Sequence, residues 1–156
     1  MRDIVLDTCT LVHANNSKSG YQEDSIELIT NLLSNTTLIT VDEGFNIDER
    51  INKSYIGLEY IKHLTPGSLG YSLIQFAAIN QRFEFVSNKV PNRIKNYIEQ
   101  LIRNKKDRIF LRVTVNSIEK VLVSHDFTDY QKLKRKRIKR DIDVNIVEAK
   151  DLNGAI

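Results

Sequence analysis

The stretch IVLDTCTLVHAN, residues 4–15, opens with a short apolar run that ends at a carboxylate. Ile4–Leu6 is apolar and mostly β-branched, which predicts a buried strand, and Asp7 follows it directly. A second run of the same character, VLVSHD at residues 121–126, brings Asp126 just beyond another expected strand. Two strands that each end near an acid indicate that the fold gathers carboxylates at one edge of a sheet.

The rest of the chain alternates strand and helix patterns around these two segments. Further strands are expected at Thr37–Val41, Phe83–Val86, Val121–Ser124 and Val144–Val147. Helical periodicity is found at Ser25–Leu33, Ser54–Leu64, Leu69–Ile79, Asn92–Arg103 and Asp107–Val115, and Gly44–Lys53 fits a loop or a small hairpin. This alternation predicts an α/β three-layer sandwich, with a mostly parallel central sheet flanked by helices. We expect residues 1–156 to form one domain, with its site at the carboxyl ends of the strands.

Composition excludes several classes of protein. No apolar run approaches the roughly 20 residues that a membrane helix needs, and the N-terminus does not fit a secretory signal, so we expect a cytoplasmic protein without a membrane partner. A single cysteine, Cys9, excludes an internal disulfide and a multi-cysteine zinc site. Cys9 fits a small buried residue better than a catalytic nucleophile.

Positive charge is concentrated in one short strip. Residues 132–140 contain seven of the 23 Lys and Arg residues and no acid, so the rest of the chain has 16 basic against 20 acidic residues, a net charge of −4. A charge run of this kind is typical of a solvated surface. Beside a nuclease site it would instead be a nucleic-acid-binding surface, formed by Lys134, Arg135, Lys136, Arg137 and Arg140.

Acids at strand exits and helix starts are the main candidates for chemistry. Clustered carboxylates repel one another unless a divalent cation neutralises them, and hard oxygen ligands favour Mg²⁺ or Mn²⁺. The chain has no glycine-rich loop that could cradle a nucleoside triphosphate, and its three histidines lie at unrelated spacings. The sequence therefore favours a carboxylate site for Mg²⁺ or Mn²⁺ over a zinc or nucleotide-triphosphate site.

Four segments resemble the PIN domain family, in the family's order. IVLDTCTLVHAN resembles its opening strand, IGLEYIKHL the helix that carries its second acid, and KKDRIFLRVTVNSIEKVLVSHDFTDY the region of its third and fourth acids, while VNIVEAKDL resembles its closing strand. The resemblance implies that the catalytic, metal-binding residues are Asp7, Glu59, Asp107 and Asp126. It implies Asp129 as an accessory metal-binding acid. It also implies supporting roles for Ser124 and Thr8. Cys9 departs from the family, which usually has Asn there.

A PIN-like domain implies a metal-dependent endoribonuclease. Such an enzyme hydrolyses phosphodiester bonds in single-stranded RNA, less commonly DNA, with one or two Mg²⁺ or Mn²⁺ ions and no covalent intermediate. The alternative is a catalytically inactive PIN-like module that binds RNA or protein. The sequence does not distinguish a toxin with an antitoxin partner from a defence effector or an RNA-processing enzyme. It also leaves open whether the protein forms a homodimer. The second acid also stays open between Glu59 and the acids Asp42, Glu43, Asp48 and Glu49.

Overall fold

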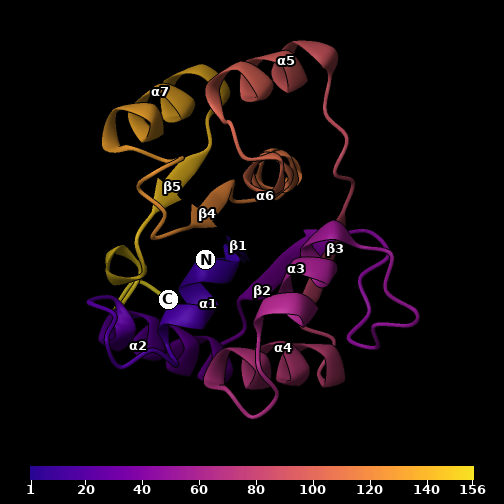
Figure 1. Ribbon diagram of the computed structural model, residues 1–156, viewed down its shortest axis with the longest axis vertical. Helices are drawn as coiled ribbons and strands as arrows, with labels where there is room; N and C mark the ends of the chain where they lie inside the picture. Colours follow the sequence, from indigo (N-terminus) through magenta and orange to yellow (C-terminus); the bar gives the residue numbers. More distant parts are fainter.

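A single parallel sheet organises the molecule (Figure 1). The computed structural model describes residues 1–156. Its strands are β1 (Asp3–Leu6), β2 (Leu38–Asp42), β3 (Phe83–Val86), β4 (Val121–Val123) and β5 (Asn145–Val147). They lie in the order β3-β2-β1-β4-β5, and every neighbouring pair is parallel. The expected mostly parallel sheet is confirmed, and β1 and β4, whose exits carry acids, are neighbours at its centre.

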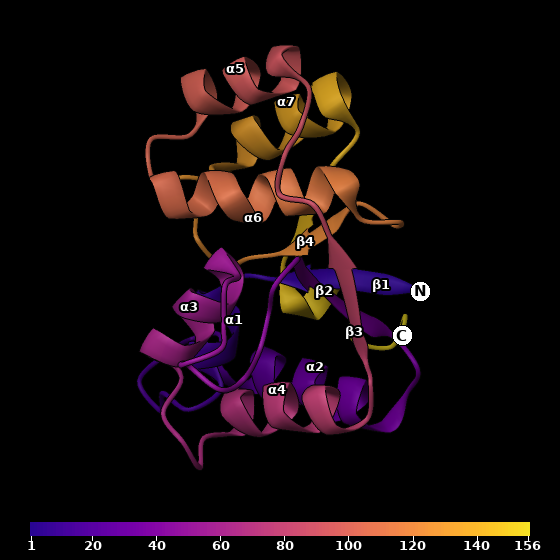
Figure 2. The same ribbon diagram turned by 90° about the vertical axis from the view of Figure 1, so that its right-hand side faces the viewer.

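Helices cover both faces of this sheet, as Figures 1 and 2 show. One layer contains α5 (Asn92–Leu101), α6 (Lys105–Asn116) and α7 (Lys132–Ile142), and the opposite layer contains α2 (Gln22–Ser34) and α4 (Leu69–Ile79). In Figure 2, α1 (Thr8–His13) and α3 (Tyr55–His63) lie at the end toward which β1 points. A short 3₁₀ turn, η1 (Ala149–Asp151), follows β5. The expected three-layer sandwich is confirmed.

Apolar strands and capped helices explain this arrangement. Ile4, Val5 and Leu6 are fully buried, because α-helices cover a parallel sheet on both faces. The hydroxyl of Ser54 accepts a hydrogen bond from the Gly57 N–H, so Ser54 is the N-cap of α3. None of the helices is long and apolar enough to cross a membrane.

Three local expectations were wrong or incomplete. Helix α6 begins at Lys105 rather than Asp107, because the Asn104 side chain caps it by accepting from the Lys106 N–H. Asp107 therefore lies inside the first turn, where its side chain is free for another role. Residues 8–13 form a helix that the sequence did not predict, since six residues are too few for a clear apolar period. The segment 44–53 forms turns rather than a hairpin.

Candidate metal centre

Three carboxylates meet at one end of the sheet. Asp107 comes from the first turn of α6, and Asp126 and Asp129 come from the loop between β4 and α7. Their side chains each offer an oxygen atom, and these atoms all lie within 4.8 Å of one another. Asp107 is buried, and the other two are half-buried. Such a set of hard oxygen ligands can hold a divalent cation.

Asp7 lies beside this group, where β1 ends. The Ser124 hydroxyl donates to Asp7 Oδ2 at 2.6 Å, and Cys9 Sγ donates to the same oxygen at 3.3 Å. Burial raises the pKa of Asp7, these two hydrogen bonds lower it in part, and the charge of Asp126 raises it. The acid expected from β1 is thus within electrostatic range of the acid expected from β4.

The Cys9 thiol is a hydrogen-bond donor rather than a nucleophile. Burial and the neighbouring Asp7 carboxylate raise the pKa of Cys9 far above that of a free thiol. A thiolate is the reactive form of cysteine, and this environment disfavours it. Cys9 therefore supports Asp7 as a hydrogen-bond donor.

Hydrogen bonds fix the loop that carries Asp126 and Asp129. Asp126 Oδ1 accepts from the backbone N–H groups of Thr128 and Asp129, at 2.8 and 3.2 Å. The Ser124 hydroxyl accepts from the Asp126 N–H at 3.1 Å. Ser124 thereby contacts Asp7 and Asp126 together, which is the supporting position expected for it. The acids are held in place before any ligand binds.

Two further side chains tie the same loop to its surroundings. The buried Tyr130 hydroxyl donates to the Asp107 carbonyl at 2.7 Å, which joins the loop to α6. The guanidinium of Arg135 donates to the carbonyl groups of Ser124, Asp126 and Tyr130. The Arg135 guanidinium also lies 4.1 Å from the centre of the Phe127 ring. Arg135 is therefore committed to the loop and is not part of a free basic surface.

The electrostatics of the group favour a bound cation. Burial raises the pKa of Asp107, and the neighbouring Asp129, Asp7 and Asp126 carboxylates raise it further. Among the residues of the expected site, two buried oxygen atoms lack any hydrogen-bond partner, Asp107 Oδ2 and Thr8 Oγ1. Unpaired buried oxygens and mutually repelling carboxylates are costly, and a divalent cation would relieve both costs. The residues present fit a divalent cation that prefers oxygen ligands.

Glu59 lies outside this group of three acids. Its oxygens contact Lys106 Nζ at 3.3 Å and His63 Nε2 at 3.4 Å. Lys106 directly precedes Asp107 in α6, so the Glu59 ion pair borders the acidic cluster. The alternative second acids have other partners or face solvent: Asp42 binds the first turn of α3, Asp48 pairs with Arg50, and Glu43 and Glu49 are exposed.

The basic strip forms most of α7, and its charged side chains differ in exposure and in ion pairing. Arg140 donates to both carboxylate oxygens of Asp141, and Asp141 Oδ2 also accepts from the Tyr97 hydroxyl. Lys134 is half-buried, whereas Lys136 and Arg137 are exposed and have no ion pair. Of the five residues expected to bind nucleic acid, only these last two present exposed and unpaired charges.

His125 also belongs to the surroundings of the site, and no sequence pattern predicts its environment. Its ring stacks on Tyr21 at 4.3 Å, and its Nε2 accepts from the Ala149 N–H at 3.0 Å. Burial lowers the pKa of His125 to about 4, and the nearby His13 lowers it too. The ring is neutral and packs behind the β4 exit.

No protein-family model matches this chain, and neither a curated protein nor a solved structure matches it.

Proposed function

We propose that this chain is a metal-dependent nuclease that hydrolyses phosphodiester bonds in single-stranded RNA. The observation that carries the proposal is the group formed by Asp107, Asp126 and Asp129, whose oxygens lie within 4.8 Å of one another. Asp7 adds a fourth carboxylate at the same end of the parallel sheet, where α/β proteins bind their ligands. The resemblance to the PIN domain family supports the same function and extends the set to Glu59.

The residues of the site would have different roles. Asp107, Asp126 and Asp129 would hold the ion, and Asp7 would add negative charge beside them. Ser124 would orient Asp7 and Asp126 through its hydroxyl. A bound Mg²⁺ or Mn²⁺ would supply positive charge that stabilises the phosphate oxygens. It would also lower the pKa of the attacking water, so that this water can act as a nucleophile at neutral pH. The half-buried loop keeps these carboxylates accessible to an extended substrate.

A cleavage assay tests this function. Labelled single-stranded RNA and DNA are incubated with the protein in Mg²⁺, Mn²⁺ or EDTA, beside the Asp7→Asn variant. We expect metal-dependent cleavage of RNA that falls at least about a hundredfold in Asp7→Asn while the melting temperature is kept. Asp48→Asn is the matched control, because Asp48 is paired with Arg50 outside the cluster.

Two results would count against the proposal. Cleavage by Asp7→Asn at the rate of the parent protein would show that the acidic cluster is not the catalytic site. Binding of RNA without cleavage in any metal would favour the non-catalytic PIN-like module.

A further inference from the structure

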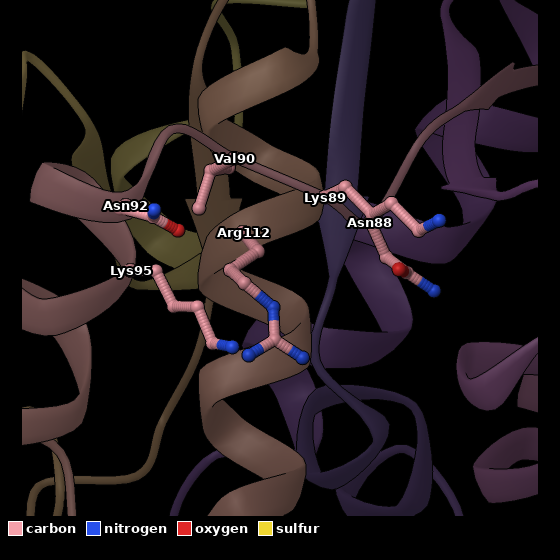
Figure 3. Close-up of a pocket in the computed structure, with 6 residues that line it drawn as sticks. All are labelled: Asn88, Lys89, Val90, Asn92, Lys95 and Arg112. Atoms are coloured by element: carbon pink, nitrogen blue, oxygen red, sulfur yellow. The ribbon is translucent and has the colours of Figure 1, made fainter.

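A polar pocket lies beside α6, apart from the acidic cluster. It occupies about 340 Å³ between the β3–α5 connection, the first turn of α5 and the middle of α6 (Figure 3). Its lining has one apolar residue, Val90, and five polar ones: Asn88, Lys89, Asn92, Lys95 and Arg112. Lys95 extends toward the Arg112 guanidinium in Figure 3. The lining thus combines three cations and two amides with no acid.

The charges in this pocket are uncompensated. None of the three cationic groups forms an ion pair or a side-chain hydrogen bond, although other cations on the chain do. Arg112 Nε is buried and has no hydrogen-bond partner. A buried donor without a partner is costly, and cations brought together repel one another. An anion with several acceptor oxygens would accept a hydrogen bond from Arg112 and reduce the repulsion among the three cations.

We propose that this pocket binds a phosphate group of the nucleic-acid strand that the acidic cluster cuts. This inference rests on the proposed function and names a contact that positions its substrate. A phosphate matches the pocket because its oxygens can accept two parallel bonds from Arg112 while lysines supply charge. Contacts of this kind position a strand and do not read its bases.

Helix α6 connects the pocket to the acidic cluster. Lys105, at the start of α6, and Arg112 are seven residues apart, so they lie on the same helix face, separated by roughly 10 Å along the axis. Lys105 is exposed and has no ion pair. Asp107 lies in the first turn of the same helix. Asp107 and Arg112 are only five residues apart in this helix, roughly 8 Å along its axis, so a strand bound at the acidic cluster can reach the pocket.

Binding measurements test the pocket separately from catalysis. Fluorescence anisotropy with labelled single-stranded RNA is recorded in Ca²⁺, in an Asp7→Asn background, at several salt concentrations. The pocket variant is Lys95→Gln/Arg112→Gln, and the matched control is Lys18→Gln/Arg93→Gln. The control removes the same charge from exposed positions, and Arg93 is only two residues from Lys95. Because Lys95 is exposed, Lys95→Gln alone separates a binding defect from a folding defect.

We expect the pocket variant to bind about tenfold more weakly than the control, the loss of one charged hydrogen-bonded contact. Its log–log salt slope should be shallower by about 0.7, the value for one phosphate on a single strand. RNAs with a 5′-phosphate and a 5′-hydroxyl distinguish the source of the phosphate. A preference for the 5′-phosphate that disappears in the pocket variant assigns the pocket to a strand end, whereas equal binding assigns it to the backbone.

Equal affinities and salt slopes for the pocket and control variants would overturn this inference, even if the parent protein cuts RNA. Displacement of the RNA by an acidic peptide in a manner that depends on Arg112 would overturn it in favour of a protein partner. Conversely, if the parent protein cuts nothing but the pocket variant loses RNA binding, the phosphate site stands and the nuclease proposal fails.

Discussion

Two buried aspartates, Asp42 and Asp107, occupy opposite electrostatic environments. Their exposed fractions are 0% and 8%, so neither carboxylate has much contact with water. Asp42, at the end of β2, accepts from the Ser54 hydroxyl, from the Tyr55 and Ile56 N–H groups and from the Asn88 amide. Asp107 has an oxygen with no partner and is surrounded by other carboxylates.

The difference shows two ways in which a protein can bury negative charge. Donors and the positive end of α3 surround Asp42, so its charge is neutralised by the fold itself. Nothing within the fold does this for Asp107, so its charge is removed either by a proton or by an external cation. The hydrogen-bond partners of a buried acid therefore separate a structural carboxylate from one that is available for a metal.

The largest expected effect on stability comes from Asp42→Asn. The substitution keeps the shape but removes a charge that accepts four hydrogen bonds, and it turns an amide group toward backbone donors. Hydrogen bonds to charged groups contribute about 1.5–3 kcal/mol each, so we expect a loss of about 3 kcal/mol in the free energy of unfolding. Denaturant unfolding in EDTA measures it.

Cleavage by the folded fraction of Asp42→Asn should stay close to that of the parent protein. A small stability loss with a large cleavage loss would place Asp42 in the metal site and break the distinction between the two aspartates.

The same substitution at Asp107 should act in the opposite direction. Because the pKa of Asp107 is raised in the folded protein, the unfolded chain releases its proton at lower pH than the folded one. The metal-free protein therefore loses stability as pH rises above about 4, the ordinary range of an aspartate. Asp107→Asn removes this cost, and we expect it to stabilise the metal-free protein by about 1–2 kcal/mol near neutral pH.

Unfolding curves in EDTA between pH 5 and 8 measure this effect. The parent protein should lose stability across the range and Asp107→Asn should lose less. Adding Mn²⁺ should stabilise the parent protein and leave the variant nearly unchanged. If Asp107→Asn is less stable than the parent at every pH without metal, Asp107 is a structural acid like Asp42.

Sequence patterns located the acids but not their partners. Apolar runs placed Asp7 and Asp126 at strand ends, and the parallel sheet then brought them to one edge. Asp42 has the same signature, an acid after a β-branched run, and only the fold shows that α3 begins against it. Composition likewise showed a basic charge run at residues 132–140, but not that Arg135 donates to three carbonyl groups of the acidic loop. Partners distant in sequence leave no local pattern.

The smallest expected effect concerns Glu59, which belongs to neither class of buried acid. Its two ion pairs are partly exposed, so Glu59→Gln should change the free energy of unfolding by less than about 1 kcal/mol. The pair also restrains the ammonium of Lys106, the residue that precedes Asp107 in α6. Once released, Lys106 can pair with the carboxylates of the acidic cluster and compete with the metal. We therefore expect cleavage to fall about tenfold, equivalent to about 1.4 kcal/mol, at limiting Mn²⁺.

Adding Lys106→Gln to Glu59→Gln separates two explanations for that loss. If Glu59 acts by restraining Lys106, the double variant recovers most of the cleavage, since the competing cation is gone. If Glu59 itself holds the metal, as the resemblance to the PIN domain family implies, the double variant stays as slow as Glu59→Gln at every Mn²⁺ concentration. Full activity of Glu59→Gln alone would remove Glu59 from the site and leave four aspartates to bind the metal.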